Sequence, residues 1–125
     1  MATDEVEHQL RRLINRTKRW GFLVFSRGKH YVQYAFYKEF DATSVIIEVI
    51  SNAYLPDDFP LSKLQMQHLS KLGFTQWSDE ENLILLAPFD EEKSLSKLST
   101  ITWHILDIVL NCRWGSDLEV SGQCW

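Results

Sequence analysis

Three runs rich in aromatic and β-branched residues follow one another in the first half of the chain. They cover residues 22–26, 30–37 and 44–50, and strands favour these residue types. The link between the first two runs, Arg27-Gly28-Lys29, contains a glycine that can adopt the positive φ of a tight hairpin turn. Strands joined by short turns pair in antiparallel fashion. The region therefore predicts a three-stranded antiparallel meander.

Apolar side chains fall on both faces of this predicted meander. In the third run, Val45, Ile47 and Val49 point to one face, while Ile46, Glu48 and Ile50 point to the other. The aromatic residues of the first two runs also divide between the faces; they are Phe22, Phe25, Tyr31, Tyr34, Phe36 and Tyr37. One set is needed for the core. If the other set is exposed, it offers an apolar groove for a peptide, or a stacking platform for bases.

Helical periodicity predicts three helices, over residues 4–19, 61–72 and 94–113. Ser62 and Gln65 have the spacing of a capping box at the start of the second helix, and Gly73 stands where a left-handed residue would end it. A fourth strand is expected over residues 82–87, closed by Pro88. Residues 118–120 are the candidate for a short additional strand.

The fold class that follows is α+β, in a single domain covering residues 1–125. A chain of 125 residues with 45% hydrophobic residues can build one packed core but not two. The expected architecture has two layers, an antiparallel sheet with helices packed on it, in the order α-β-β-β-α-β-(β)-α.

The third predicted helix carries more apolar surface than a single contact requires. Trp103, Leu106 and Leu110 widen its apolar stripe beyond the roughly 100° that faces a core. Either another element of the same chain covers these residues, or they form a homodimer interface.

Composition narrows the partners and the compartment. The formal charge of −4 disfavours a nucleic-acid-coating role, and no apolar run approaches the roughly 20 residues that span a bilayer. The acidic start, Met1-Ala2-Thr3-Asp4-Glu5, does not resemble a signal or transit peptide. Two distant cysteines, Cys112 and Cys124, suit a reducing compartment. The expected location is the cytoplasm.

No motif predicts a catalytic residue, a cofactor site or a metal site. His104 and Asp107 are spaced so that a carboxylate could orient an imidazole, but no nucleophile motif accompanies them, so a solvated helix-surface pair is the better reading. His68 fits a partly buried or interface residue better than a ligand. The acidic runs 79–81 and 90–92 lack the spacing and glycine of a calcium loop and are expected to be solvated loops.

Arg12, Arg16 and Arg19 align on the first predicted helix, opposite its apolar stripe. Such a row attracts phosphates, and nucleic-acid binding begins with contacts of this kind. The net negative charge favours another interpretation, in which the row is a solvated face paired with Glu5 or Glu7, or faces an acidic partner.

Residues 31–74 resemble the TY-Chap and YbjN families of bacterial domains, which are placed with the type III secretion chaperone fold and include cyanobacterial proteins of similar length. The stretches that carry the resemblance are Tyr31-Val32-Gln33-Tyr34, Glu48-Val49-Ile50-Ser51-Asn52-Ala53-Tyr54-Leu55-Pro56 and Leu69-Ser70-Lys71-Leu72-Gly73-Phe74. Phe74 stands where relatives often have tryptophan. The resemblance implies an α+β, chaperone-like domain, commonly homodimeric, that can hold an extended segment of a client. It does not imply service to a secretion system.

These observations together predict a non-enzymatic, chaperone-like module that binds a client or partner protein. Capture would use strand addition or apolar pockets on the sheet, with Tyr34, Phe36, Ile46 and Ile50 as candidate contacts. The alternative is a regulatory or assembly factor that recognises one dedicated folded protein. A small-ligand or nucleic-acid role is a third possibility that the charge and motifs favour less.

Overall fold

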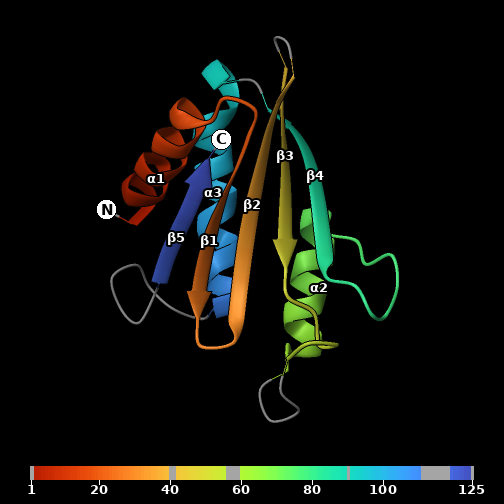
Figure 1. The fold of residues 1–125 in the computed structure, drawn as a ribbon. Coiled ribbons are helices and arrows are strands. Elements are labelled where there is room, and N and C mark those ends of the chain that lie inside the picture. Colours follow the sequence, from red (N-terminus) through yellow and green to blue (C-terminus); the bar gives the residue numbers. More distant parts are fainter. Residues whose placement is uncertain (1, 40–41, 56–59, 90, 111–118, 125) are drawn as a thin grey trace.

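In the computed structural model, eight elements form a five-stranded sheet and three helices (Figure 1). The structure describes residues 2–39, 42–55, 60–89, 91–110 and 119–124. The elements in chain order are α1 (Ala2–Arg16), β1 (Trp20–Arg27), β2 (His30–Glu39), β3 (Ala42–Val49), α2 (Lys63–Leu72), β4 (Leu83–Phe89), α3 (Glu91–Leu110) and β5 (Glu119–Cys124). The α+β class and the antiparallel sheet predicted from the sequence are confirmed.

The strands lie in the order β4-β3-β2-β1-β5, and every neighbouring pair is antiparallel. The predicted meander forms the centre of this sheet, and Gly28 adopts a φ of 63° in its hairpin. The expected order placed the additional strand before the last helix, and the structure corrects this, since β5 follows α3. The strand pairs with β1, so it extends the edge of the sheet opposite β4. It covers Glu119–Cys124 and so ends further along than predicted, while residue 118 lies outside the described residues.

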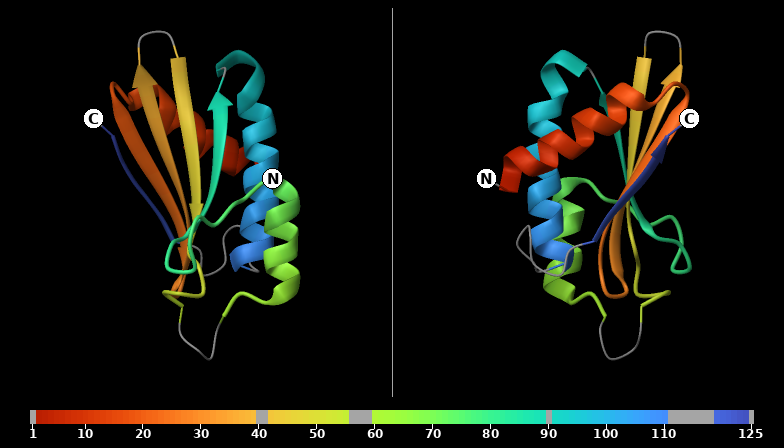
Figure 2. Two further views of the ribbon diagram at one scale, coloured as in Figure 1. Left: turned by 90° about the vertical axis from the view of Figure 1, so that its right-hand side faces the viewer. Right: turned by 60° about the vertical axis from the view of Figure 1, so that its left-hand side comes forward.

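All three helices lie on the same side of the sheet (Figure 2). Helix α3 packs on β1 and β2, α1 crosses α3 and also contacts β1 and β5, and α2 packs against α3. The core between the two layers includes Leu10 and Ile14 of α1, Ile105 of α3 and Leu69 of α2, each at most 3% exposed. The second layer is therefore built by helices from both ends and the middle of the chain.

The local signals around α2 behave as the sequence predicts. The Ser62 hydroxyl accepts a hydrogen bond from the Gln65 backbone N–H, and the Gln65 side chain accepts one from the Ser62 N–H. Gly73 ends the helix in the left-handed region, with a φ of 107°. The Gln65 amide also donates to the Ile108 carbonyl over 2.7 Å, which ties the first turn of α2 to α3.

Several predicted boundaries are wrong by a few residues. Helix α1 ends at Arg16 rather than residue 19, because the chain turns and enters β1 at Trp20. Strand β4 continues through Pro88 to Phe89. It can do so because β4 is an edge strand, where a residue without an N–H is tolerated. Helix α3 begins at Glu91 and so absorbs part of the expected acidic loop.

Candidate functional site

One face of the sheet is covered by the helices, and the opposite face is not covered by any described element (Figure 2). Strand alternation separates the two sets of side chains. On β2, for example, Val32, Tyr34 and Phe36 are fully buried against the helices, while Tyr31 and Tyr37 point to the opposite side. We call this second side, formed by strands β1 to β5, the open face.

A row of apolar side chains crosses the open face from β1 to β4. The strand register places Phe22 opposite Ala35, Ala35 opposite Ile46, and Ile46 opposite Leu86. Phe22, Ala35 and Ile46 are half-buried, whereas Leu86 on the edge strand is 61% exposed. We call these four residues the apolar row. An apolar row of this kind, exposed to water in the described structure, is a feature of interaction surfaces.

A hollow with aromatic walls lies at one end of the apolar row. It is lined by Arg19, Trp20, Tyr37, Lys38 and Ser44, and we call it the Trp20 hollow. Trp20 and Tyr37 are register partners, and they are 39% and 45% exposed. Trp20 also stacks on Phe22, with ring centroids 6.2 Å apart, so the hollow is continuous with the row. The Lys38 ammonium donates to the Ile14 carbonyl over 2.6 Å, which joins β2 to the end of α1.

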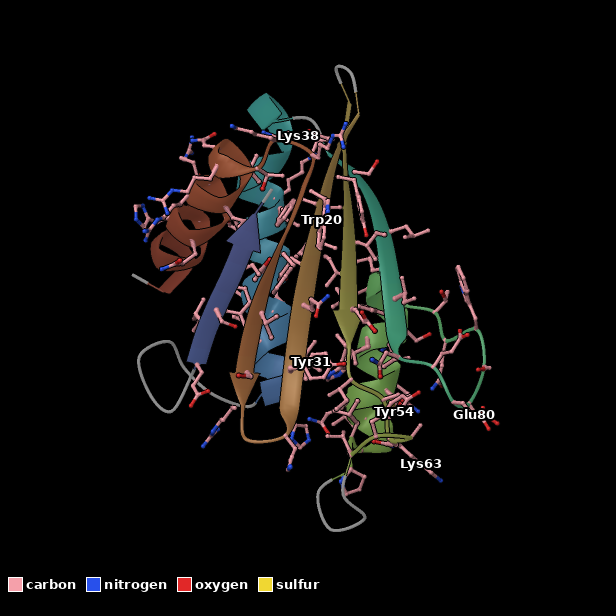
Figure 3. The ribbon with its side chains drawn as sticks, viewed as in Figure 1. Trp20, Tyr31, Lys38, Tyr54, Lys63 and Glu80 are labelled. Atoms are coloured by element: carbon pink, nitrogen blue, oxygen red, sulfur yellow. The ribbon has the colours of Figure 1, made fainter. Side chains whose placement is uncertain are left out.

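A second hollow lies toward the other end of the sheet, where β3 ends and β4 begins. Its lining residues, Glu48, Tyr54, Trp77, Glu81, Asn82 and Ile84, define what we call the Trp77 hollow. Trp77 is 71% exposed and Tyr54 is 62% exposed. The Tyr54 hydroxyl donates to the Glu80 carbonyl over 2.5 Å, so the loop before β4 is held beside the sheet (Figure 3).

Asn82 organises the polar floor of the Trp77 hollow. Its side-chain oxygen accepts a 2.9 Å hydrogen bond from the Ser51 N–H, and its amide nitrogen donates to the Tyr31 hydroxyl and to Glu48 Oε1 at 2.9 and 2.8 Å. Burial raises the pKa of Tyr31, the negative charge of Glu48 raises it further, and the hydrogen bond from Asn82 opposes both. The four groups connect β2, β3 and β4.

The structure corrects three of the four peptide contacts expected from the sequence. Tyr34 and Phe36 are fully buried between sheet and helices, and Ile50, just beyond the end of β3, is 5% exposed. These side chains are part of the core and are not accessible to a ligand. Ile46 alone lies on the open face, within the apolar row.

The expected dimer contacts on α3 are also placed differently. Leu106 is fully buried, and Trp103 is half-buried and packs against the core. The reason is that α3 packs on β1 and β2 and also contacts both α1 and α2, so several elements of the same chain surround it. Leu110 is the last residue of α3, and its side chain lies outside the described residues. The first alternative left open by the sequence, an element of the same chain, therefore accounts for Leu106.

The histidine and acidic candidates lie on the molecular surface. His104 and Asp107 are both exposed on α3. His68 is exposed on α2, so the expectation that it is partly buried is wrong, while an interface role stays a prediction. Residues 79–81 are exposed in the loop before β4. Of the second acidic run, Asp90 lies outside the described residues, and Glu91 and Glu92 begin α3. Within the described part of the chain, no group of three or more histidine, cysteine, aspartate or glutamate residues is placed to hold a metal ion.

The predicted arginine row is divided. Arg12 and Arg16 lie on α1, but Arg19 comes after the end of the helix and lines the Trp20 hollow. Of the two glutamates expected to pair with the row, Glu7 forms a 3.0 Å ion pair with Arg11 instead, and the side chain of Glu5 lies outside the described residues. Cys112 and the side chain of Cys124 lie outside the described residues.

Four exposed large apolar residues around the open face were not among the predicted site residues: Trp20, Tyr54, Trp77 and Leu86. Trp20 lies between the predicted helix 4–19 and the predicted strand 22–26, although it alternates with Leu23 and Phe25 on the opposite face of β1. That alternation was the available signal. Tyr54 and Trp77 come from loops and had no periodic signal.

Comparisons with protein-family models, with curated proteins and with solved structures find no match to this chain. None of the helices in the described ranges is long and apolar enough to cross a membrane.

Proposed function

We propose that this chain is a non-enzymatic, chaperone-like module that holds a segment of a client polypeptide on the open face of its sheet. The observation that supports this most strongly is the apolar row, which ends in the exposed side chain of Leu86 and adjoins Trp20 and Tyr37. Aromatic residues are enriched at protein interfaces. A client side chain placed on the row would remove apolar surface from water on both partners.

The client would lie across the face of the sheet rather than extend the edge at β4. Pro88, which pairs with Ser44, has no N–H, so it cannot donate a hydrogen bond to an added strand. The face instead offers anchoring positions at two ends, Trp20 with Tyr37 and Tyr54 with Trp77. Side chains of an extended segment could occupy both hollows while its middle contacts the apolar row.

The alternative is a regulatory or assembly factor that binds one folded protein through the same open face. Competition separates the two functions. A module that holds extended segments should release its client when an excess of an unstructured apolar peptide is added. A factor that recognises the shape of a folded partner should keep it.

Leu86→Glu tests the open face, and Leu64→Glu is its matched control. Both leucines are 61% exposed, but Leu64 lies on α2, on the helical side of the molecule. Proteins retained from a lysate of the source cells by each immobilised variant would be identified by mass spectrometry. We expect the wild type and Leu64→Glu to retain the same polypeptides and Leu86→Glu to lose them. Equal retention by all three would contradict the proposal.

A homodimer remains a prediction from the resemblance. The same two variants test whether a second copy occupies the open face, because sedimentation equilibrium gives the mass of each. A dimeric wild type that becomes monomeric only in Leu86→Glu would identify self-association there. In that case client binding and dimerisation would compete for one surface.

A further inference from the structure

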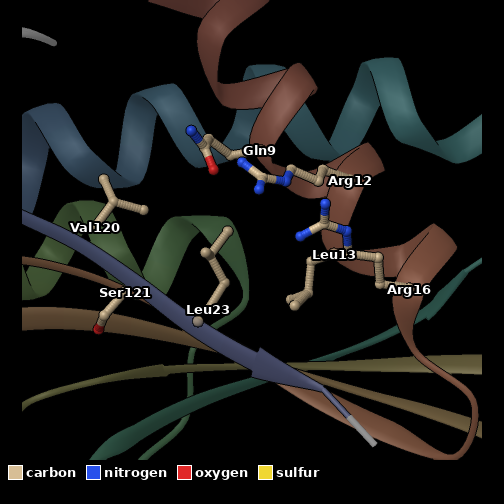
Figure 4. Close-up of a pocket in the computed structure, with 8 residues that line it drawn as sticks. Gln9, Arg12, Leu13, Arg16, Leu23, Val120 and Ser121 are labelled. Atoms are coloured by element: carbon tan, nitrogen blue, oxygen red, sulfur yellow. The ribbon is translucent and has the colours of Figure 1, made fainter.

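A pocket separate from the open face lies between α1 and β5, on the helical side of the sheet (Figure 4). Its volume is about 220 Å³, and we call it the α1–β5 pocket. The residues that line it are Gln9, Arg12, Leu13, Arg16, Leu23, Val120, Ser121 and Gly122. Neither the apolar row nor the two hollows of the open face contribute to it.

The rim of the pocket is basic. Arg12 and Arg16 are one helical turn apart, and both side chains extend from α1 into the space beside β5 (Figure 4). Neither guanidinium has a hydrogen bond or ion pair among the described residues, and the nearest acidic residue on the helix, Glu7, is paired with Arg11. Two like charges at this spacing repel each other. An anion between them would remove that repulsion.

The floor of the pocket is apolar. It consists of Leu13 and Leu23, which are 7% and 3% exposed, and of Val120, which is half-buried. The Ser121 side chain points away from the arginines (Figure 4), so its hydroxyl is not part of the rim. Gly122 keeps the pocket open on the β5 side, because a Cβ there would lie 3.1 Å from the Phe22 carbonyl oxygen and 3.2 Å from the Leu23 side chain.

We propose that the α1–β5 pocket binds a small amphipathic oxyanion, a carboxylate or phosphate carried on a short aliphatic group. Guanidinium groups match the geometry of carboxylate and phosphate oxygens and bind them with paired hydrogen bonds. The headgroup lies between Arg12 and Arg16, with the Gln9 amide at the same rim, and the aliphatic part contacts Leu13, Leu23 and Val120. The volume is below the roughly 300 Å³ at which pockets for drug-sized ligands begin, so the ligand is small.

The experiment titrates ¹⁵N-labelled protein with straight-chain carboxylates of two to eight carbons and, separately, with the matching alkyl phosphates. Amide chemical shifts locate the site and give the affinity. We expect shifts at residues of the pocket and an affinity that rises with chain length, by up to about fourfold for each added methylene, until the floor is covered. The series that binds more tightly identifies the headgroup.

Three variants separate this site from general attraction to a basic helix. Arg12→Gln and Arg16→Gln should each weaken binding by roughly tenfold or more, since each removes charged hydrogen bonds. Arg11→Gln is the matched control and should change nothing, because Arg11 lies on the same helix but is paired with Glu7. Val120→Phe fills the floor without changing the arginines, so it should abolish the dependence on chain length while acetate still binds.

Two results would overturn the proposal. One is an affinity that does not depend on chain length, which would mean attraction to exposed charge only. The other is an equal loss of binding in Arg11→Gln and Arg12→Gln. Both outcomes are independent of the open face, since a variant such as Leu86→Glu leaves the α1–β5 pocket unchanged.

Discussion

The Tyr34 hydroxyl donates a 2.6 Å hydrogen bond to Thr102 Oγ1, which joins the middle of β2 to the middle of α3 inside the core. Both residues are fully buried. The Thr102 hydroxyl in turn donates a 2.6 Å hydrogen bond to the Leu98 carbonyl. The ring of Tyr34 packs edge-on against Phe25 and stacks with Phe36. The residue that the sequence suggested as a peptide contact is thus a central link between the two layers.

Because Tyr34 donates to Thr102 and Thr102 donates to Leu98, removing the Tyr34 hydroxyl and removing the Thr102 hydroxyl should destabilise the fold to different extents. Tyr34→Phe should lower the free energy of unfolding by about 1 kcal/mol, because Thr102 keeps its bond to Leu98. Thr102→Val preserves the shape but leaves the Tyr34 hydroxyl buried without an acceptor, so it should cost more, up to about 3 kcal/mol. Urea denaturation measures both. The double variant should recover part of the loss, and Tyr37→Phe, 45% exposed on the same strand, should have almost no effect.

Burial of Tyr34 also predicts a loss of stability at alkaline pH. Burial raises the pKa of this phenol far above its usual value of 10.0, so the folded state keeps the proton that the unfolded state releases. The contribution is fully present below pH 10 and falls as the pH rises above it, with a limiting slope of about 1.4 kcal/mol per pH unit. Denaturation midpoints between pH 9 and the onset of alkaline unfolding measure the slope. Tyr34→Phe should reduce this slope. A smaller slope should remain, because the pKa of Tyr31 is also raised in the folded state.

Asn82→Ala should destabilise the protein by about 2–3 kcal/mol, because three hydrogen bonds depend on this side chain. The buried Ser51 N–H would lose its acceptor, and an unpaired buried donor costs more than a lost surface bond. Gln76→Ala is a suitable control, since its amide makes one exposed hydrogen bond to the Glu81 carbonyl and should cost well under 1 kcal/mol. Thermal unfolding followed by circular dichroism compares the two. Similar losses would show that the Asn82 bonds contribute little.

Gly73→Ala should cost more than Gly28→Ala, although both glycines have a positive φ. At Gly28 an added Cβ meets nothing within 4 Å, so only the left-handed conformation is penalised, by roughly 1–2 kcal/mol. At Gly73 the φ of 107° is less accessible to alanine, and the Cβ would lie 3.1 Å from Leu85 Cδ1. A cost of about 1–3 kcal/mol is expected there. Chemical denaturation of the two variants under one condition gives the difference, and equal costs would mean that Leu85 moves aside freely.

Local chemistry was sufficient to predict most of the fold. The run of strand-forming residues before Gly28 and after it predicted the hairpin, and the reciprocal bonds of Ser62 and Gln65 were predicted from their spacing of three. Such signals work because capping and tight turns involve residues close together in the chain. Element boundaries were less accurate where a tertiary contact decides them, as at Trp20, which pairs with Tyr37 in the sheet.

The candidate site was harder to predict from the sequence than the fold. Alternation correctly separated Val45, Ile47 and Val49 from Ile46, but both sets are apolar, so composition could not show which face the helices cover. The packing of α3 between the sheet and the other two helices decided that Leu106 belongs to the core. The two arginines of the α1–β5 pocket lie beside an apolar floor to which β5, more than 100 residues away in the chain, contributes Val120.

By itself, the sequence determined the helices, the strands, the turns and the division of each strand into two faces, because these depend on interactions between near neighbours. The tertiary structure alone decided which face is open and which arginines share a pocket. Those outcomes depend on how distant elements pack. A period of two assigns side chains to faces, but only the position of the helices determines which face remains exposed to water.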